Sequence, residues 1–68
     1  MSMGARLAQA RRGQNMTQEQ LAEKLGVTRQ AVSRWESDTA YPETDKIVRM
    51  AALFGVSCAY LLGVSTEP

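Results

Sequence analysis

Two short segments of this 68-residue chain share one pattern: a glycine, then a valine, then a hydroxyl residue. They are Gly26-Val27-Thr28 and Gly55-Val56-Ser57. Glycine readily takes the left-handed conformation in which helices end, and a Thr or Ser side chain caps the free amides of a following helix. Each segment therefore predicts the end of one helix and, directly after it, the start of another. A chain with two such junctions is restricted to short helices packed closely together.

Apolar residues recur at helical spacing along the chain, and no stretch alternates as a half-buried strand would. The clearest example is the i, i+3, i+4, i+7 series Ile47, Met50, Ala51 and Phe54. The pattern predicts an all-α fold with five helices, over residues 3–14, 17–25, 28–37, 44–54 and 57–62.

Local side-chain signals support several of these boundaries. Thr17 and Gln20 have the spacing of a capping box. An apolar residue before each cap and another four residues after it form hydrophobic staples, in the pairs Met16–Leu21, Val27–Val32 and Val56–Leu61. We expect the first helix to end through Asn15, which tolerates the left-handed conformation, with Gly13 as the competing stop.

Length and composition exclude many kinds of protein. The length allows one small domain over residues 1–68 and leaves little room for a large substrate cavity. The chain has no His and one Cys, Cys58, which excludes a four-ligand zinc site, a catalytic triad and a disulfide scaffold. We expect no enzyme, no cofactor and no metal. With no apolar run near the ~20 residues of a membrane span and no signal peptide, we expect a soluble, cytoplasmic protein.

The charges are divided unevenly between the two halves of the chain. The net charge is only +1, which alone argues against a binder of nucleic acid. Residues 1–34, however, carry six basic against two acidic residues, and residues 35–68 carry two against five. The amino-terminal half is therefore at +4 and able to face phosphate, unless the chain simply has an ordinary mixed surface.

The two middle helices are joined only by Gly26 and Val27, so they must cross steeply, as in a helix-turn-helix over residues 17–37. Ala22 provides a small residue where the helices meet. The apolar residues expected to seal the pair are Leu21, Leu25, Val27, Val32 and Trp35.

The second helix of this pair has a polar face suited to reading DNA bases. With Val32 and Trp35 inward, the side chains pointing outward are Arg29, Gln30, Ser33 and Arg34. Arg pairs with guanine and Gln with adenine in the major groove. The alternative is a solvated helix face, and the helix-turn-helix context favours the DNA reading.

The segment QEQLAEKLGVTRQAVSRWES, residues 18–37, resembles the helix-turn-helix of the Cro/cI-type phage repressors and of the wider XRE family of bacterial regulators. The resemblance extends to Tyr41-Pro42, to residues 53–57 and to Leu61-Leu62. It implies a five-helix lambda-repressor-like domain that binds double-stranded DNA. It also implies phosphate contacts by Gln18 and Thr28 and base reading by Arg29, Gln30 and Arg34 with Ser33 beside them. An ion pair between Arg11 and Glu36 is implied as well.

The chain departs from this family after its third helix. The family usually has Gly and a basic residue where its backbone meets phosphate, and here the sequence is Ser37-Asp38-Thr39-Ala40. Asp38 would repel phosphate, so we expect either that it turns away or that the loop uses its amides and the Ser37 or Thr39 hydroxyls. We expect binding that is weaker and more salt-sensitive than is usual in the family. Thr44 replaces a residue that is usually apolar.

The carboxyl end, residues 57–68, is unusually apolar, with Tyr60, Leu61, Leu62 and Val64. These residues either pack on the core or form the contact of a homodimer. We expect a repressor that binds a palindromic operator as a dimer. The alternative is an antitoxin-like module that holds a partner protein, with DNA binding used for autoregulation.

Overall fold

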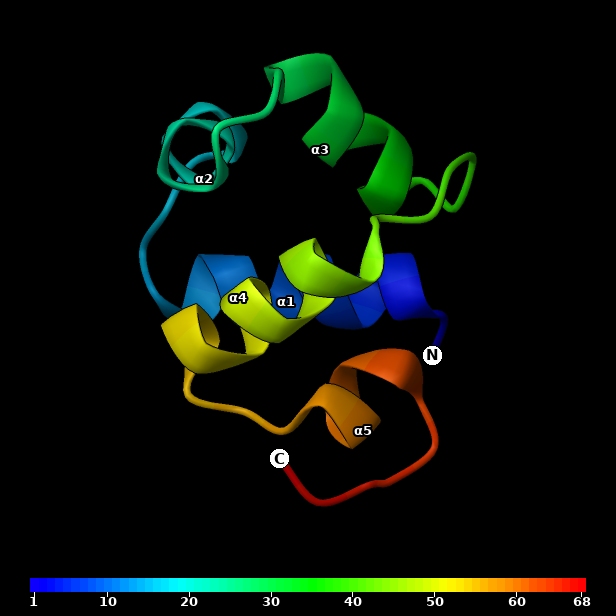
Figure 1. Cartoon of the computed structure of the whole chain (residues 1–68). Coiled ribbons are helices and arrows are strands. Elements are labelled where there is room, and N and C mark those ends of the chain that lie inside the picture. Colours follow the sequence, from blue (N-terminus) through cyan, green and yellow to red (C-terminus); the bar gives the residue numbers. More distant parts are fainter.

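The structure, a computed structural model that describes all 68 residues, contains five helices and no strand. They are α1 (Met3–Gly13), α2 (Gln18–Leu25), α3 (Arg29–Glu36), α4 (Thr44–Phe54) and α5 (Cys58–Leu62). The predicted all-α, five-helix organisation is confirmed. Figure 1 shows α2 and α3 at one end of the molecule, α1 and α4 across its middle and α5 at the opposite end.

The helix junctions have the conformations that the sequence predicts. Gly26 and Gly55 are left-handed, with φ of 70° and 69°, and end α2 and α4. Thr17, Thr28 and Ser57 each accept a hydrogen bond from the backbone amide three residues later. These caps are flanking residues and not part of the helices, so α2, α3 and α5 each begin one residue later than expected. Helix α3 also ends one residue earlier than expected, at Glu36, because Ser37 is its C-cap.

The first helix is slightly shorter than expected. Its last residue is Gly13, Gln14 is its C-cap, and Asn15 follows in the left-handed conformation with φ of 57°. The carbonyls of Arg11 and Arg12 accept bonds from the amides of the turn, so the chain leaves the helix before Asn15 and reverses there.

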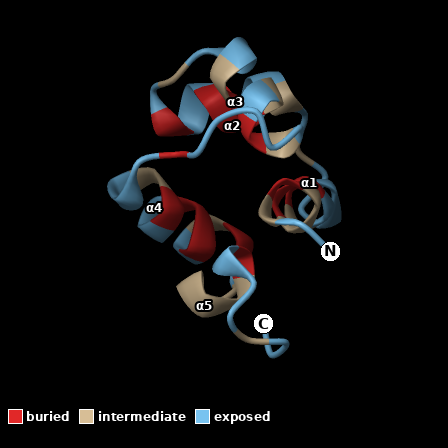
Figure 2. Ribbon diagram, turned by 90° about the vertical axis from the view of Figure 1, so that its right-hand side faces the viewer, coloured by how far each residue is buried: buried red, intermediate tan, exposed pale blue.

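The helices turn their apolar faces toward one core, as Figure 2 shows. The core residues are Leu7, Leu21, Ala22, Leu25, Val32, Trp35, Met50, Ala51, Phe54 and Leu61. Leu61 is completely buried, so its assignment to a dimer surface is wrong: it packs α5 onto the core. The expected staple residues Met16, Val27 and Val56 are half-buried against the same core. None of the helices has the length and apolar character needed to cross a membrane.

One contact between α1 and α3 involves backbone on both sides. Gly4 is buried in the first turn of α1, and a Cβ atom there would lie 2.5 Å from the carbonyl oxygens of both Trp35 and Glu36. Only glycine allows the amino-terminal end of α1 to approach the last turn of α3 this closely. The contact fixes the end of α3 on α1.

Candidate nucleic-acid interface

Helix α3 buries one face and presents the other to solvent. Val32 and Trp35 are buried, whereas Arg29, Gln30 and Arg34 are exposed and Ser33 is half-buried. The ion pairs of the chain are Arg11–Glu36 and Lys46–Asp45, so neither Arg29 nor Arg34 has a carboxylate partner. The helix thus holds a row of free donor side chains on a backbone that is fixed at both ends.

A buried carboxylate joins α1, α2 and α3. Arg11 donates to Glu36 twice, from Nε to Oε2 at 2.6 Å and from Nη2 to Oε1 at 3.0 Å. Its Nη1 also donates to the Met16 carbonyl at 2.7 Å. The ion pair expected from the family resemblance is therefore present, and both side chains are at least nine-tenths buried. Arg11 is a structural residue: three of its five N–H donors are engaged inside the protein, and its side chain is buried.

Gln18 lies in the first turn of α2, where the family resemblance places a phosphate contact. Its Nε2 donates to Glu36 Oε1 at 3.0 Å, which holds the half-buried amide group against the end of α3. One N–H of this amide group is used in that bond and the other stays available. Thr28 uses its Oγ1 only as an acceptor, from the Ala31 amide at 3.1 Å, so its hydroxyl hydrogen is also available.

The loop after α3 uses its polar groups on the helix itself. The Arg34 carbonyl accepts from the amides of Thr39 and Ala40 at 2.9 and 3.3 Å. The hydroxyls of Ser37 and Thr39 lie 3.2 and 3.1 Å from the same carbonyl oxygen and 3.0 Å from one another. Both side chains, which the sequence suggested for phosphate contacts, therefore form the carboxyl-terminal cap of α3.

Asp38 turns away from the exposed face of α3. Its backbone is left-handed, with φ of 62°, and its Oδ1 accepts from the Gly4 amide at 2.9 Å. A hydrogen bond from the Ser2 hydroxyl and the bond from the Gly4 amide hold the pKa of Asp38 below its ordinary value. Asp38 thus belongs to the cap of α1, which neither helical periodicity nor the family resemblance predicted.

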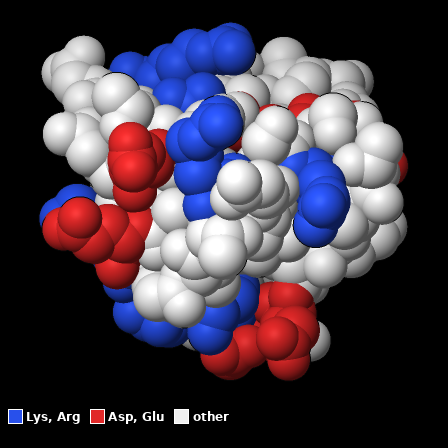
Figure 3. Space-filling view, turned by 90° about the horizontal axis from the view of Figure 1, so that it is seen from above, with Lys and Arg blue, Asp and Glu red and all other residues white.

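Positive and negative charges are mixed over the end of the molecule formed by α2 and α3. Figure 3, seen from the side of α2 and α3, shows several groups of Lys and Arg with Asp and Glu between them. Two arginines of the basic half are engaged elsewhere, since Arg11 pairs with Glu36 and Arg6 lies 4.9 Å from the centre of the Tyr60 ring. The +4 of residues 1–34 therefore overstates the charge that is free to meet phosphate.

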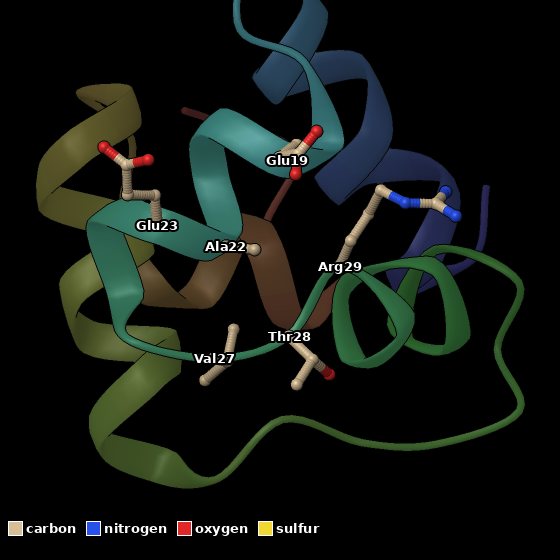
Figure 4. Close-up of a pocket in the computed structure, with 6 residues that line it drawn as sticks. All are labelled: Glu19, Ala22, Glu23, Val27, Thr28 and Arg29. Atoms are coloured by element: carbon tan, nitrogen blue, oxygen red, sulfur yellow. The ribbon is translucent and has the colours of Figure 1, made fainter.

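A shallow hollow of about 260 Å³ lies between α2 and the start of α3. Figure 4 shows Glu19 and Glu23 of α2 on one side of it and Thr28 and Arg29 on the other, with Ala22 between them. The lining carries two carboxylates and one guanidinium, so its net charge is negative and disfavours an anion deep in the hollow.

A helix-turn-helix family model matches residues 7–61, which include α2, α3 and α4 and most of α1 and α5. The chain belongs to the XRE-type helix-turn-helix family. The family predicted from residues 18–37 is thereby confirmed.

Curated relatives are similar over nearly all of this domain. YobD of Bacillus subtilis strain 168, an uncharacterized HTH-type transcriptional regulator, is 40% identical over 63 residues, which are 93% of this chain and 56% of YobD. ImmR of the same organism, an HTH-type transcriptional regulator, is 41% identical over 93% of this chain and 50% of its own length. BcrR of Enterococcus faecalis, an HTH-type transcriptional activator, is 44% identical over 91% of this chain and 30% of its own length. The chain thus spans about half the length of these relatives, or less.

Solved structures of the P22 c2 repressor share the fold. The repressor in complex with a synthetic operator superposes with a TM-score of 0.88 at 26% identity, over 96% of this chain and 98% of that one. The solution structure of the DNA-binding domain of the same repressor gives a TM-score of 0.83 at 26% identity, over 100% of this chain and 92% of that one. These likenesses confirm the lambda-repressor-like fold.

Proposed function

We propose that this domain binds double-stranded DNA sequence-specifically, with α3 in the major groove, as part of a transcriptional regulator. The observation that carries the proposal is the exposed row Arg29, Gln30 and Arg34, which has no carboxylate partner and lies on a helix whose two ends are both fixed. Arg matches the acceptor edge of guanine and Gln the edge of adenine. The P22 c2 repressor, which has this fold, is bound to operator DNA in its solved complex.

The proposed contacts divide into base-reading and phosphate-binding groups. Arg29, Gln30 and Arg34, with Ser33 beside them, read bases. The second N–H of Gln18 and the Thr28 hydroxyl bind phosphate. Ser37 and Thr39 bind phosphate only if their hydroxyls leave the Arg34 carbonyl, and we therefore rank them below the other two.

We further propose a repressor that acts in the cytoplasm and binds a near-palindromic operator as a homodimer, with the two α3 helices about 34 Å apart. The dimer contact is assigned to the end of the chain, where Leu62 and Val64 are 45% and 77% exposed beside the half-buried Tyr60. No catalytic step is part of the proposal.

Selection of bound sequences from a random duplex library tests the function. We expect an enriched palindrome with half-sites about 10 bp apart. With that duplex, Arg29→Ala or Gln30→Ala should weaken binding by about 1–3 kcal/mol and relax preference at one base pair. Val48→Ala, at an exposed position of α4, is the matched control and should change neither quantity.

Two results would overturn the proposal. If both alanine variants keep the affinity and the sequence preference of the wild type, α3 does not read bases. If no duplex is enriched and the chain instead purifies with a tightly held small protein, it is the antitoxin-like interaction module.

A further inference from the structure

Asp38 is an acidic residue placed two positions after the helix proposed to read DNA. Nothing in the proposed DNA contacts uses a negative charge there, and a carboxylate near phosphate lowers affinity by repulsion. Its left-handed backbone, with φ of 62°, would suit glycine or asparagine equally well. The left-handed backbone therefore does not by itself account for an acidic residue here.

The carboxylate makes a contact 34 residues away in the sequence. Asp38 Oδ1 accepts from the Gly4 amide at 2.9 Å. That amide is one of the four at the start of α1 that no helix carbonyl can satisfy. Ser2, the N-cap of α1, satisfies a different one, the amide of Ala5 at 3.1 Å. The loop after α3 thus completes a cap that the local sequence of α1 provides only in part.

This hydrogen bond lies where α1 and α3 meet most closely. The Gly4 backbone is packed under the Trp35 and Glu36 carbonyls, so a bond at the same glycine holds the loop and the last turn of α3 against α1. Helix α3 has only eight residues, and a helix of that length is marginal unless its ends are held by other parts of the fold.

We propose that Asp38 is a positioning residue: by accepting from the Gly4 amide it fixes the carboxyl end of α3 on α1 and so sets the placement of Arg34 and the rest of the DNA-reading face. This inference rests on the proposed function. The requirement is for a hydrogen-bond acceptor at residue 38 and not for its charge. When α3 is correctly placed for only a fraction of the time, the apparent dissociation constant rises in inverse proportion to that fraction.

Two substitutions separate the acceptor from the charge. Asp38→Asn and Asp38→Gly both remove the negative charge, and both tolerate the left-handed backbone. Only asparagine keeps an acceptor for the Gly4 amide. Repulsion of phosphate by Asp38, acting alone, predicts that both variants bind DNA more tightly than the wild type, and to the same extent.

The affinities are measured on the palindromic duplex enriched by the wild-type chain, at a temperature where all three proteins are fully folded by circular dichroism. We expect Asp38→Asn to bind at least as tightly as the wild type. We expect Asp38→Gly to bind roughly threefold to tenfold more weakly than Asp38→Asn, as loss of a helix cap at one end of α1 implies. Its preference for that duplex over a scrambled one should also fall, which a change in fold stability alone would not produce.

Hydrogen exchange of the Gly4 amide tests the contact without DNA. The amide should exchange at similar rates in the wild type and Asp38→Asn, and faster in Asp38→Gly. Equal affinity of the two variants, or equal Gly4 exchange in them, would overturn the inference. If the wild type enriches no duplex, it is the proposed function that fails, and the Gly4 exchange still decides whether Asp38 holds α3 on α1.

Discussion

A Cβ atom on residue 4 would lie 2.5 Å from two backbone carbonyl oxygens and 2.8 Å from Asp38 Oδ1. The backbone cannot yield as a flexible side chain would, so Gly4→Ala must push α1 away from α3. Alanine is the better helix former by about 1 kcal/mol, so propensity alone predicts the opposite effect. We expect the clash to dominate and the free energy of unfolding to fall by about 1–3 kcal/mol in urea titrations.

Gly13 in the same helix provides the control, because a Cβ atom there has nothing within 4 Å. Gly13→Ala should raise the free energy of unfolding by about 0.5–1 kcal/mol. Equal stabilisation by both substitutions would show that the backbone contact at Gly4 is not tight.

A second prediction concerns the Asp38 carboxylate and the dependence of the unfolding free energy on pH. Hydrogen bonds from the Ser2 hydroxyl and the Gly4 amide favour the carboxylate, so the folded-state pKa lies below the unfolded one. Its stabilising contribution is present above about pH 4, the unfolded value, and is lost as the pH falls through the folded value. The pKa of Asp45 is also lowered, chiefly by Lys46, so acid alone does not isolate Asp38.

Asp38→Asn removes the Asp38 titration and leaves that of Asp45. The difference in unfolding free energy between the wild type and this variant should be constant from pH 7 to about pH 5 and should then change, to the disadvantage of the wild type, below about pH 4. Urea titrations at each pH measure it. A difference that is independent of pH would contradict the assignment of the shift to Asp38.

At the scale of the helices, prediction succeeded where the signal was local. The starts of α2, α3 and α5 follow from Thr17, Thr28 and Ser57, whose capping bonds lie within three residues of sequence. The direction in which α3 faces follows from helical periodicity alone. The orientation of Asp38 could not be predicted, because it depends on a contact between residues far apart in the sequence. Its carboxylate turns away from the exposed face of α3 to accept from the amide of Gly4, 34 residues earlier. Glycine inside an expected helix was the available signal, since it marks a close backbone approach.

The ion pair between α1 and α3 is also a contact between distant elements, but its residues were recognisable through the family. Arg11→Met would leave the Glu36 carboxylate buried without its charge partner, and removal of one member of a buried pair costs about 3–5 kcal/mol. We expect a loss of that size in the free energy of unfolding. The double variant Arg11→Met/Glu36→Leu should be more stable than Arg11→Met, because no unpaired charge remains buried. Independent, additive losses in the double variant would show that the two residues are not coupled.

Across the whole chain, several basic side chains bond to carbonyl or carboxylate groups of other segments, which their positions in the sequence do not suggest. Arg6 donates to the Tyr60 and Met1 carbonyls, Arg11 is neutralised by Glu36, and Arg49 donates to the Lys24 carbonyl at the end of α2. Much of the basic charge therefore holds helices together. The chain has few free cations for phosphate, so a single copy is expected to bind DNA weakly and two copies to be needed for useful affinity.

That expectation can be tested at the exposed end of the chain. Val64 is 77% exposed, and in a two-fold dimer the same surface meets itself, so Val64→Lys would place two like charges at the contact. We expect binding to the enriched palindrome to weaken roughly tenfold or more, since burial of one valine is worth about 1.5 kcal/mol. Binding to a duplex that carries one half-site should not weaken, because a single copy makes no dimer contact. Fluorescence anisotropy with the two duplexes measures both affinities. If both fall alike, Val64 acts on folding or on DNA; if neither changes, the copies meet through another surface.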